Sequence, residues 1–215
     1  MQDLLLVRHG ASEHLAKNFT GGWTDLPLTN RGRWQAQETG KRLQTVLTEL
    51  IGTDSMEFFA SDLVRATETA EIIASYVNQE PEYVPALREI NNGVARDRSL
   101  EEAIELRRPR EGSLLDWVRY EQGESRRMLF NRVSAFLEKR SSETVETVLL
   151  ASHMHTISCI IHWWLDLPVE YLNTIFYHVD PCSITILSVS RFGEKTIKKL
   201  NETAHLSDEL FTSPT

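Results

Sequence analysis

The stretch Leu4-Leu5-Leu6-Val7-Arg8-His9-Gly10 decides how this chain is interpreted. Four consecutive apolar residues flanked by polar ones predict a buried strand of a parallel sheet. Open parallel sheets bind ligands outside the carboxyl ends of their strands, so His9 is expected where chemistry is usually done. A neutral imidazole can attack phosphorus, the guanidinium of Arg8 can grip phosphate oxygens, and Gly10 lets backbone approach a ligand closely. A strand-end turn with a merely polar histidine is the alternative, and these residues alone leave both open.

Length and charge limit the classes of protein to which the chain can belong. With 215 residues, one sizeable domain is expected. A formal net charge of −8 argues against a nucleic-acid partner and against an anionic membrane, because both need a basic face. No signal-peptide or membrane-spanning pattern is present, so we expect a cytoplasmic protein. Cys159 and Cys182 lie in apolar surroundings and are expected to be reduced, buried thiols.

Strand and helix patterns alternate along the chain, which predicts an α/β fold with a largely parallel sheet. The polar segment 97–140 is expected to be mostly helical, with breaks near Pro109, Gly112 and Gly123. Strands are expected at 4–7, 56–60, 145–151, 175–179 and 183–190, and helices at 32–50, after 61–62 and at 157–167.

Three of the expected strand ends carry unusual polar residues, at Arg8-His9-Gly10, at 62–67 and at Ser152-His153. Carboxyl ends of parallel strands share one edge of a sheet, so these groups are expected to converge on one pocket. Arg65 would lie in the first turn of its helix, where a cation is unfavourable unless an anion lies nearby. A solvated arginine is the alternative for Arg65 alone, but two histidines at equivalent strand ends strengthen the functional interpretation.

Five motifs in this order resemble the histidine phosphatase superfamily, in its phosphoglycerate-mutase-like branch. They are Arg8-His9-Gly10-Ala11-Ser12-Glu13, Thr20-Gly21-Gly22-Trp23-Thr24-Asp25 with Pro27-Leu28-Thr29, Ser61-Asp62-Leu63-Val64-Arg65-Ala66-Thr67-Glu68-Thr69-Ala70, Arg88-Glu89 and Ser152-His153. The resemblance runs from residue 4 to about residue 189 and implies a three-layer α/β/α sandwich with a mostly parallel central sheet. It implies a single domain over 1–215, with a variable helical cap at about 92–140 and a loose tail after about 202.

Carried over to the matching positions, the resemblance implies a role for each residue. His9 would be the nucleophile that becomes phosphohistidine, and Arg8, Arg65 and His153 would hold the phosphoryl oxygens. Glu89 would protonate the leaving alkoxide and then activate the water. A general acid must hold its proton near neutral pH, so we expect the pKa of Glu89 to lie above that of an ordinary glutamate. His9 must be neutral, and the flanking arginines would help to keep it so.

Several positions depart from the family pattern or are less certain in role. Leu15 stands where the family often has asparagine, and Asn18 is a candidate substitute. Met154 follows the second histidine, where glycine is common in the family. Met154 and His155 are candidates to line the mouth of the substrate site. The alternatives are that Met154 faces the core and that His155 faces solvent. Thr20-Gly21 resembles the family's substrate loop and is a further candidate for substrate binding.

No metal and no cofactor are expected, because His153 and His155 lack accompanying metal-ligand spacing. The basic cluster Arg107-Arg108-Pro109-Arg110 contacts either a second anionic group of the substrate or interleaved glutamates on a solvated face, and the second is favoured. Trp163-Trp164 fills the core or a dimer contact, so a homodimer remains open. Four histidines receive no functional role: His14, His162, His178 and His205.

The predicted function is a metal-independent phosphatase that hydrolyses a small-molecule phosphomonoester through a phosphohistidine on His9. The interval between Glu89 and His153 is short beside the long insertion typical of the mutases, which favours hydrolysis. Two alternatives stay open. One is a 2,3-bisphosphoglycerate-dependent phosphoglycerate mutase. The other is a weakly catalytic phospho-ligand-binding protein, which Leu15 and Met154 keep in consideration.

Overall fold

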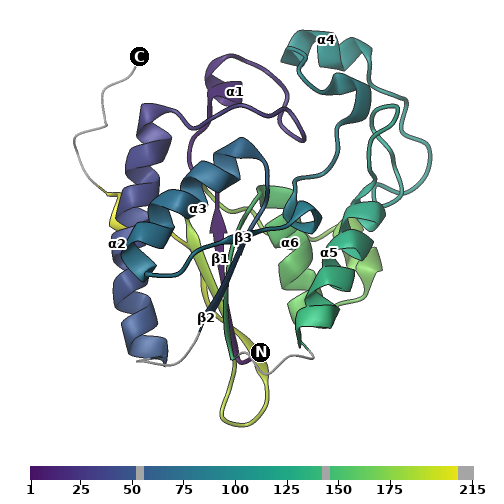
Figure 1. The fold of residues 1–215 in the computed structure, drawn as a ribbon. Coiled ribbons are helices and arrows are strands. Elements are labelled where there is room, and N and C mark those ends of the chain that lie inside the picture. Colours follow the sequence, from purple (N-terminus) through teal and green to yellow (C-terminus); the bar gives the residue numbers. More distant parts are fainter. Residues whose placement is uncertain (52–55, 142–145, 208–215) are drawn as a thin grey trace.

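β1 (Asp3–Arg8), the strand expected from the opening apolar run, lies inside a six-stranded sheet (Figure 1). The computed structural model describes residues 1–51, 56–141 and 146–207. The strand order is β3-β2-β4-β1-β5-β6, in which β1 to β4 run parallel, β5 is antiparallel to β1, and β6 is antiparallel to β5. The other strands are β2 (Met56–Ala60), β3 (Glu82–Tyr83), β4 (Thr147–Ser152), β5 (Ile184–Val189) and β6 (Lys195–Glu202).

Helices cover both faces of the sheet because successive side chains of each strand point to opposite faces. Leu4 and Leu6 of β1 belong to one buried cluster, and Leu5 and Val7 belong to the other. All four are at most 1% exposed, which explains an uninterrupted apolar run in place of an alternating one. Figure 1 shows helices on both faces of the sheet, which confirms the predicted three-layer sandwich. They are α2 (Asn30–Ile51) and α3 (Val64–Val77) on one face and α5 (Arg126–Ser141) and α6 (Met154–Trp164) on the other.

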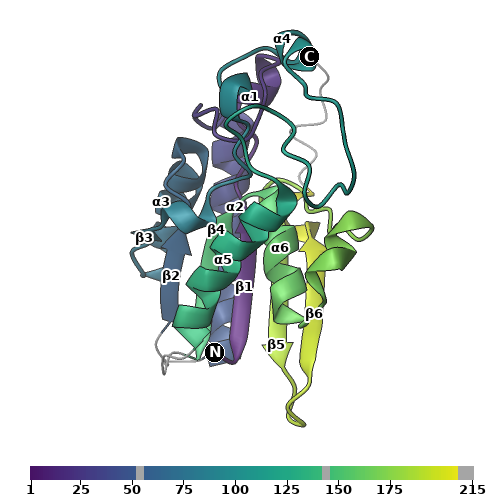
Figure 2. The ribbon, with the colours of Figure 1, turned by 90° about the vertical axis from the view of Figure 1, so that its right-hand side faces the viewer.

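The segment 97–140 is less helical than predicted. α4 (Leu100–Glu105) is a single short helix, and residues 107–125 form turns and irregular backbone before α5 begins. α5 is part of the sandwich rather than of a cap, because Leu129, Val133 and Leu137 are buried against the sheet. The segment that extends beyond the carboxyl ends of the strands is therefore 92–125, as Figure 2 shows for α4 and the loop after it.

The C-terminal end differs from the prediction at two places. Residues 175–179 form no strand; the rings of Phe176 and Tyr177 instead lie tilted and edge-on against histidines of α6. β6 is an unexpected edge strand, whose three lysines obscure its apolar alternation. Lysines on an edge strand discourage pairing with another chain, so their presence there has a physical reason.

The start of the predicted loose tail is attached to the sandwich. The His205 ring Nε2 lies 2.9 Å from the Thr39 hydroxyl and 3.1 Å from the carbonyl oxygen of Cys182, while 208–215 fall outside the described residues. Cys159 and Cys182 are buried and unpaired, as predicted. Nowhere in the ranges 1–51, 56–141 and 146–207 is a helix long and apolar enough to span a membrane.

The carboxyl ends of β1, β2 and β4 meet at one edge of the sheet. Beyond the last paired residues, the His9 amide donates to the Ser152 carbonyl at 2.9 Å, and the Ser61 amide donates to the Ala151 carbonyl at 3.0 Å. His153 directly follows the end of β4. The three strand ends singled out in the sequence are therefore neighbours in space.

α2 begins against the loop that follows His9. A Cβ added to Gly32 would lie 2.0 Å from the carbonyl oxygen of Ala11, and one added to Gly10 would lie 2.6 Å from that of Gly32. Because backbone meets backbone here, neither neighbour can rotate away. Two glycines thus allow the helix to approach the candidate nucleophile closely.

We expect Gly32→Ala to lower the free energy of unfolding by about 2 kcal/mol through overpacking. Helix propensity alone predicts the opposite sign, because alanine is favoured over glycine by about 1 kcal/mol inside a helix. Urea unfolding measures the difference. Arg31→Ala, at the exposed position beside it, is the control and should change stability by less than about 0.5 kcal/mol. A stabilised Gly32→Ala variant would contradict the close contact.

Candidate active site

His9 is held in one tautomer at the end of β1. Its Nδ1 lies 2.8 Å from the Gly10 carbonyl oxygen, and its Nε2 lies 3.2 Å from Nε of Arg65. A carbonyl only accepts and a guanidinium only donates, so Nδ1 carries the proton and Nε2 presents a lone pair. Burial, and then the charges of Arg65 and Arg8, hold the pKa of His9 well below its usual range. The predicted neutral histidine is thus present, and Nε2 is its unprotonated nitrogen.

Arg65 is buried, only 1% exposed, in the first turn of α3. Its two terminal nitrogens donate to the carbonyl oxygens of Thr24 and Gly22, each at 2.7 Å. Burial lowers its pKa to about 10, which still leaves the guanidinium charged at neutral pH. The solvated-arginine alternative is therefore wrong, because the 20–25 loop encloses this side chain beside His9.

Arg8 and His153 present unpaired polar atoms near His9. Arg8 donates to the Val179 carbonyl at 2.7 Å, but its Nε is buried and has no partner among the described residues. His153 lies 2.8 Å from the Ser61 hydroxyl through Nε2, and its buried Nδ1 has no partner within the same ranges. The His9 and His153 ring centroids are 5.0 Å apart. A buried polar group without a partner calls for an explanation, and for these two atoms, which lie beside His9, a role in binding an anion supplies one.

The backbone at Glu89 is fixed by three of the sequence motifs. Arg88 forms a two-pronged ion pair with Asp62, with nitrogen–oxygen distances of 2.7 and 2.6 Å. The carbonyl oxygen of Glu89 accepts from the Trp23 indole at 2.8 Å and from Arg132 at 3.2 Å. These contacts set the direction in which the Glu89 side chain points.

The Glu89 carboxylate is stabilised as an anion, contrary to the prediction. One oxygen accepts from the Ile90 amide at 2.8 Å, and the other lies 3.2 Å from the His155 amide and 3.4 Å from the His155 ring Nδ1. Burial raises the pKa of Glu89, but the attraction of His155 and these hydrogen bonds outweigh burial and lower the pKa to about 2. The expected raised pKa is wrong for this arrangement, because the sequence could not show three donors converging on one carboxylate. The alternative of a solvent-facing His155 is also wrong, because its amide and its ring Nδ1 both contact Glu89.

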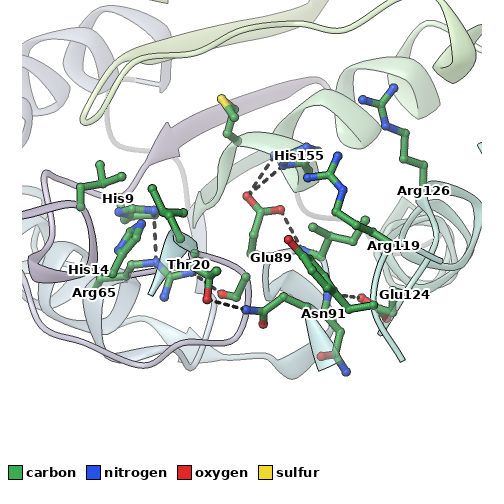
Figure 3. A pocket seen from close by; sticks show the side chains of 18 of the residues that line it. His9, His14, Thr20, Arg65, Glu89, Asn91, Arg119, Glu124, Arg126 and His155 are labelled. Carbon is green, nitrogen blue, oxygen red and sulfur yellow. Dashed lines mark hydrogen bonds and ion pairs between the residues drawn. The ribbon is translucent and has the colours of Figure 1, made fainter. Parts of the chain in front are cut away.

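A cavity of about 320 Å³ is lined by Arg8, His9, Arg65, Glu89 and His155, but not by His153, which is fully buried. Figure 3 shows His9, His14 and Arg65 at one end of the cavity, Glu89 and His155 in the middle, and Arg119, Arg126 and Glu124 at the other end. Small-molecule sites commonly have volumes from about 300 Å³ upward, so the cavity suits a ligand larger than a phosphate ion.

Of the five residues predicted from the sequence as candidates for substrate binding, four line this cavity and Asn18 does not. Asn18 is exposed and occupies a left-handed turn with φ of 56°, where its carbonyl accepts from the Leu100 amide. Thr20 uses its hydroxyl within the protein, donating to the Ala95 carbonyl at 2.6 Å and accepting from Asn92 at 3.1 Å. The four that line the cavity are Thr20, Gly21, Met154 and His155.

Sequence reasoning missed His14, which is buried in α1 (Glu13–Ala16) and lines the cavity. Its ring centroid lies 6.3 Å from that of His9, and its Nδ1 lies 2.8 Å from the Ser12 hydroxyl. Burial, followed by the charges of Arg65 and Arg8, lowers its pKa to about 4. Its only signal in the sequence is its nearness to His9, because a single helical turn sets up no periodicity.

Metal-ligating side chains do not gather elsewhere. Across 1–51, 56–141 and 146–207, no group of three or more His, Cys, Asp or Glu side chains is placed to hold a metal ion. Metal independence remains a prediction that a chelator tests.

Comparisons with known proteins give a consistent result. A family model described as the histidine phosphatase superfamily (branch 1) matches residues 4–203. The chain is 34% identical over 174 residues to a protein named probable phosphoglycerate mutase GpmB from Escherichia coli O1:K1. The match covers 78% of this chain and 77% of that protein.

Two solved structures share the fold at lower identity. A mycobacterial glucosyl-3-phosphoglycerate phosphatase is 20% identical with a TM-score of 0.75, and the match covers 94% of this chain and 100% of that one. A putative alpha-ribazole-5'-P phosphatase from Escherichia coli K-12 is 23% identical with a TM-score of 0.73, covering 94% and 96%. At these identities the likeness concerns the fold.

The site predicts that acid destabilises the protein. His9, His14 and His153 have pKa values lowered from 6.5, so the unfolded chain takes up protons first, and stability present above pH 6.5 is lost as the pH falls. Glu89, lowered from 4.5 to about 2, acts in the same direction below pH 4.5. Between pH 6.5 and pH 4, we expect His14→Gln to reduce the slope of the unfolding free energy plotted against pH by about 1.4 kcal/mol per pH unit.

Urea unfolding at a series of pH values measures this slope. His178→Gln is the matched control, because the His178 side chain is 67% exposed. Equal slopes for wild type and His14→Gln would show that His14 is not held neutral in the folded protein.

Proposed function

Because this chain belongs to the histidine phosphatase superfamily, we propose that it is a phosphatase that hydrolyses a small phosphomonoester through a phosphohistidine on His9. One observation carries the proposal: the unprotonated Nε2 of a buried, neutral His9 lies 3.2 Å from the guanidinium of Arg65 beside a cavity. Phosphoryl transfer depends on a positioned nucleophile and on cations around the phosphoryl oxygens, and both are present.

In the first step, Nε2 of His9 attacks phosphorus and the bond to the substrate alkoxide breaks. Arg65, the unpaired Nε of Arg8 and the unpaired Nδ1 of His153 supply donors to the phosphoryl oxygens. The Gly10 carbonyl, 2.8 Å from Nδ1, stabilises the positive charge that develops on the ring when Nε2 bonds to phosphorus.

Glu89 supplies the proton to the alkoxide and later takes one from the attacking water. Its low pKa requires that substrate binding itself promotes protonation, and a phosphoryl dianion beside the carboxylate does so by like-charge repulsion. In the second step water attacks the phosphohistidine, the nitrogen–phosphorus bond breaks, and Glu89 accepts the proton of the water. Inorganic phosphate leaves and His9 is neutral again.

A phosphoglycerate mutase is the second candidate, because the relative at 34% identity carries that name as a probable function. A mutase would use the same residues to return the phosphoryl group to the bound organic product. The short segment 92–125 over the strand ends favours hydrolysis, since little chain is available to retain an intermediate away from water.

We expect wild type to hydrolyse p-nitrophenyl phosphate without loss of activity in EDTA, and His9→Ala to lose turnover by at least about 1,000-fold. Glu89→Gln should slow kcat by about 100-fold or more. Because nitrophenolate leaves without a proton, the Glu89→Gln variant should still be phosphorylated and should accumulate acid-labile phosphohistidine. Rapid-quench labelling with ³²P measures both steps. Glu101→Gln, at an exposed position of α4, is the control and should behave as wild type.

The rivals give different results in the same experiment. Bisphosphoglycerate-dependent interconversion of phosphoglycerates with negligible release of phosphate identifies a mutase. Ligand binding by folded wild type with neither turnover nor phosphohistidine identifies a binding protein and rejects the proposal.

A further inference from the structure

Two arginines at the end of the cavity away from His9 are unused by the proposed chemistry (Figure 3). Neither Arg119 nor Arg126 forms an ion pair with any carboxylate in the described parts of the chain. Their neighbours do: Arg127 pairs with Asp116 at 2.6 Å and Arg132 with Glu124 at 2.8 Å. An unpaired guanidinium lining a cavity is a site for an anion.

The nearby carboxylate does not neutralise them. Both oxygens of Glu124 are occupied, one by Arg132 at 3.0 Å and the other by Arg132 at 2.8 Å and the Asn91 amide at 2.9 Å. Although the whole chain carries a formal charge of −8, this end of the cavity is therefore locally cationic.

Arg126 is held by neighbouring groups, whereas Arg119 is exposed and lies over an aromatic ring. Arg126 donates to the Leu172 carbonyl at 2.7 Å and lies 5.6 Å from the centroid of the Phe176 ring. Arg119 lies 5.2 Å from the centroid of the Trp117 ring. A guanidinium restrained in this way loses less entropy when it binds a ligand.

We propose that the substrate carries a second anionic group, a carboxylate or a second phosphate, which Arg119 and Arg126 bind while the phosphomonoester lies at His9. This inference rests on the proposed function and specifies its substrate class. In the sequence, the cluster Arg107-Arg108-Pro109-Arg110 offers such a contact only as the less favoured alternative to a solvated face, and none of these residues lines the cavity. The backbone over 107–125 is irregular, and without periodicity the direction of a side chain cannot be inferred.

The test measures binding and turnover separately. In a His9→Ala background, calorimetry compares 3-phosphoglycerate and glycerol 1,3-bisphosphate with glycerol 3-phosphate, which lacks the second anion. We expect one of the two doubly anionic ligands to bind at least about tenfold more tightly than glycerol 3-phosphate. The double variant that carries both Arg119→Gln and Arg126→Gln should lose that preference. Arg107→Gln is the matched control, because Arg107 lies 5.1 Å from the same Trp117 ring outside the cavity lining.

The preferred ligand identifies the second anion as carboxylate or phosphate. Equal affinity for all three ligands, or a preference that survives the double substitution, overturns the subsite. If wild type shows no phosphatase turnover but the preference is present and depends on the two arginines, the proposed function fails and the subsite stands.

A second inference rests on a different observation, the free Nε2 of His14. Ser12 fixes the ring through Nδ1, whereas Nε2 forms no hydrogen bond with the described chain and faces the cavity beside His9. Gly21 leaves this nitrogen accessible, since a Cβ there would lie only 3.5 Å from it. We infer that the Ser12 hydroxyl donates to Nδ1, so that Nε2–H donates to an oxygen of the phosphoryl group bound at His9.

Orthovanadate, a mimic of the transferred phosphoryl group, is the probe for His14. We expect His14→Ala to weaken vanadate binding by about tenfold, and His14→Gln, which keeps an N–H donor, to recover part of it. Tryptophan fluorescence measures binding, and thermal unfolding checks that both variants are folded. Vanadate affinity equal to that of wild type in folded His14→Ala overturns the inference, and so does an equal loss in both variants.

Discussion

The buried guanidinium of Arg65 is the constraint on which the catalytic end of the molecule depends. A charge this far from water is costly unless it is hydrogen-bonded, and each of the three guanidinium nitrogens has a partner, in His9 and in the carbonyls of Thr24 and Gly22. One side chain of α3 thereby joins the loop after α1 to the end of β1. The same contact directs the lone pair of His9 at the guanidinium that we propose as a phosphate ligand.

The parts of this protein that follow regular backbone could be predicted, and the others could not. Leu4 to Val7 alternate between two covered faces of the sheet, so the sequence pattern identifies the strand and the point at which it ends. Because the ends of parallel strands meet at one edge, the prediction that His9, Arg65 and His153 lie together is correct. His14 comes from a single helical turn, Arg119 from irregular chain and Arg126 from the first position of α5, and at none of these places does spacing indicate the direction of a side chain. The direction of the pKa shift of Glu89 depends on His155, which is distant in sequence and contacts the carboxylate only in the folded chain.

The cavity combines a cationic lining with a strongly anionic protein. A formal charge of −8 spread over the chain repels large polyanions, whereas the arginines inside a recess attract a small anion at short range. The low pKa of Glu89 works against this attraction, because it keeps the carboxylate anionic until a bound phosphoryl group promotes its protonation.

The segment 92–125 contributes ligand-facing residues but little to the sandwich, which is closed by α5 and α6 on one face and by α2 and α3 on the other. Arg119 and the other lining residues of this segment therefore lie in a stretch of the gene that the sandwich does not constrain, whereas Arg126 belongs to α5. Drift within that stretch can reshape one end of the cavity while His9, Arg65 and His153 keep their positions, so relatives with the same sandwich need not share a ligand.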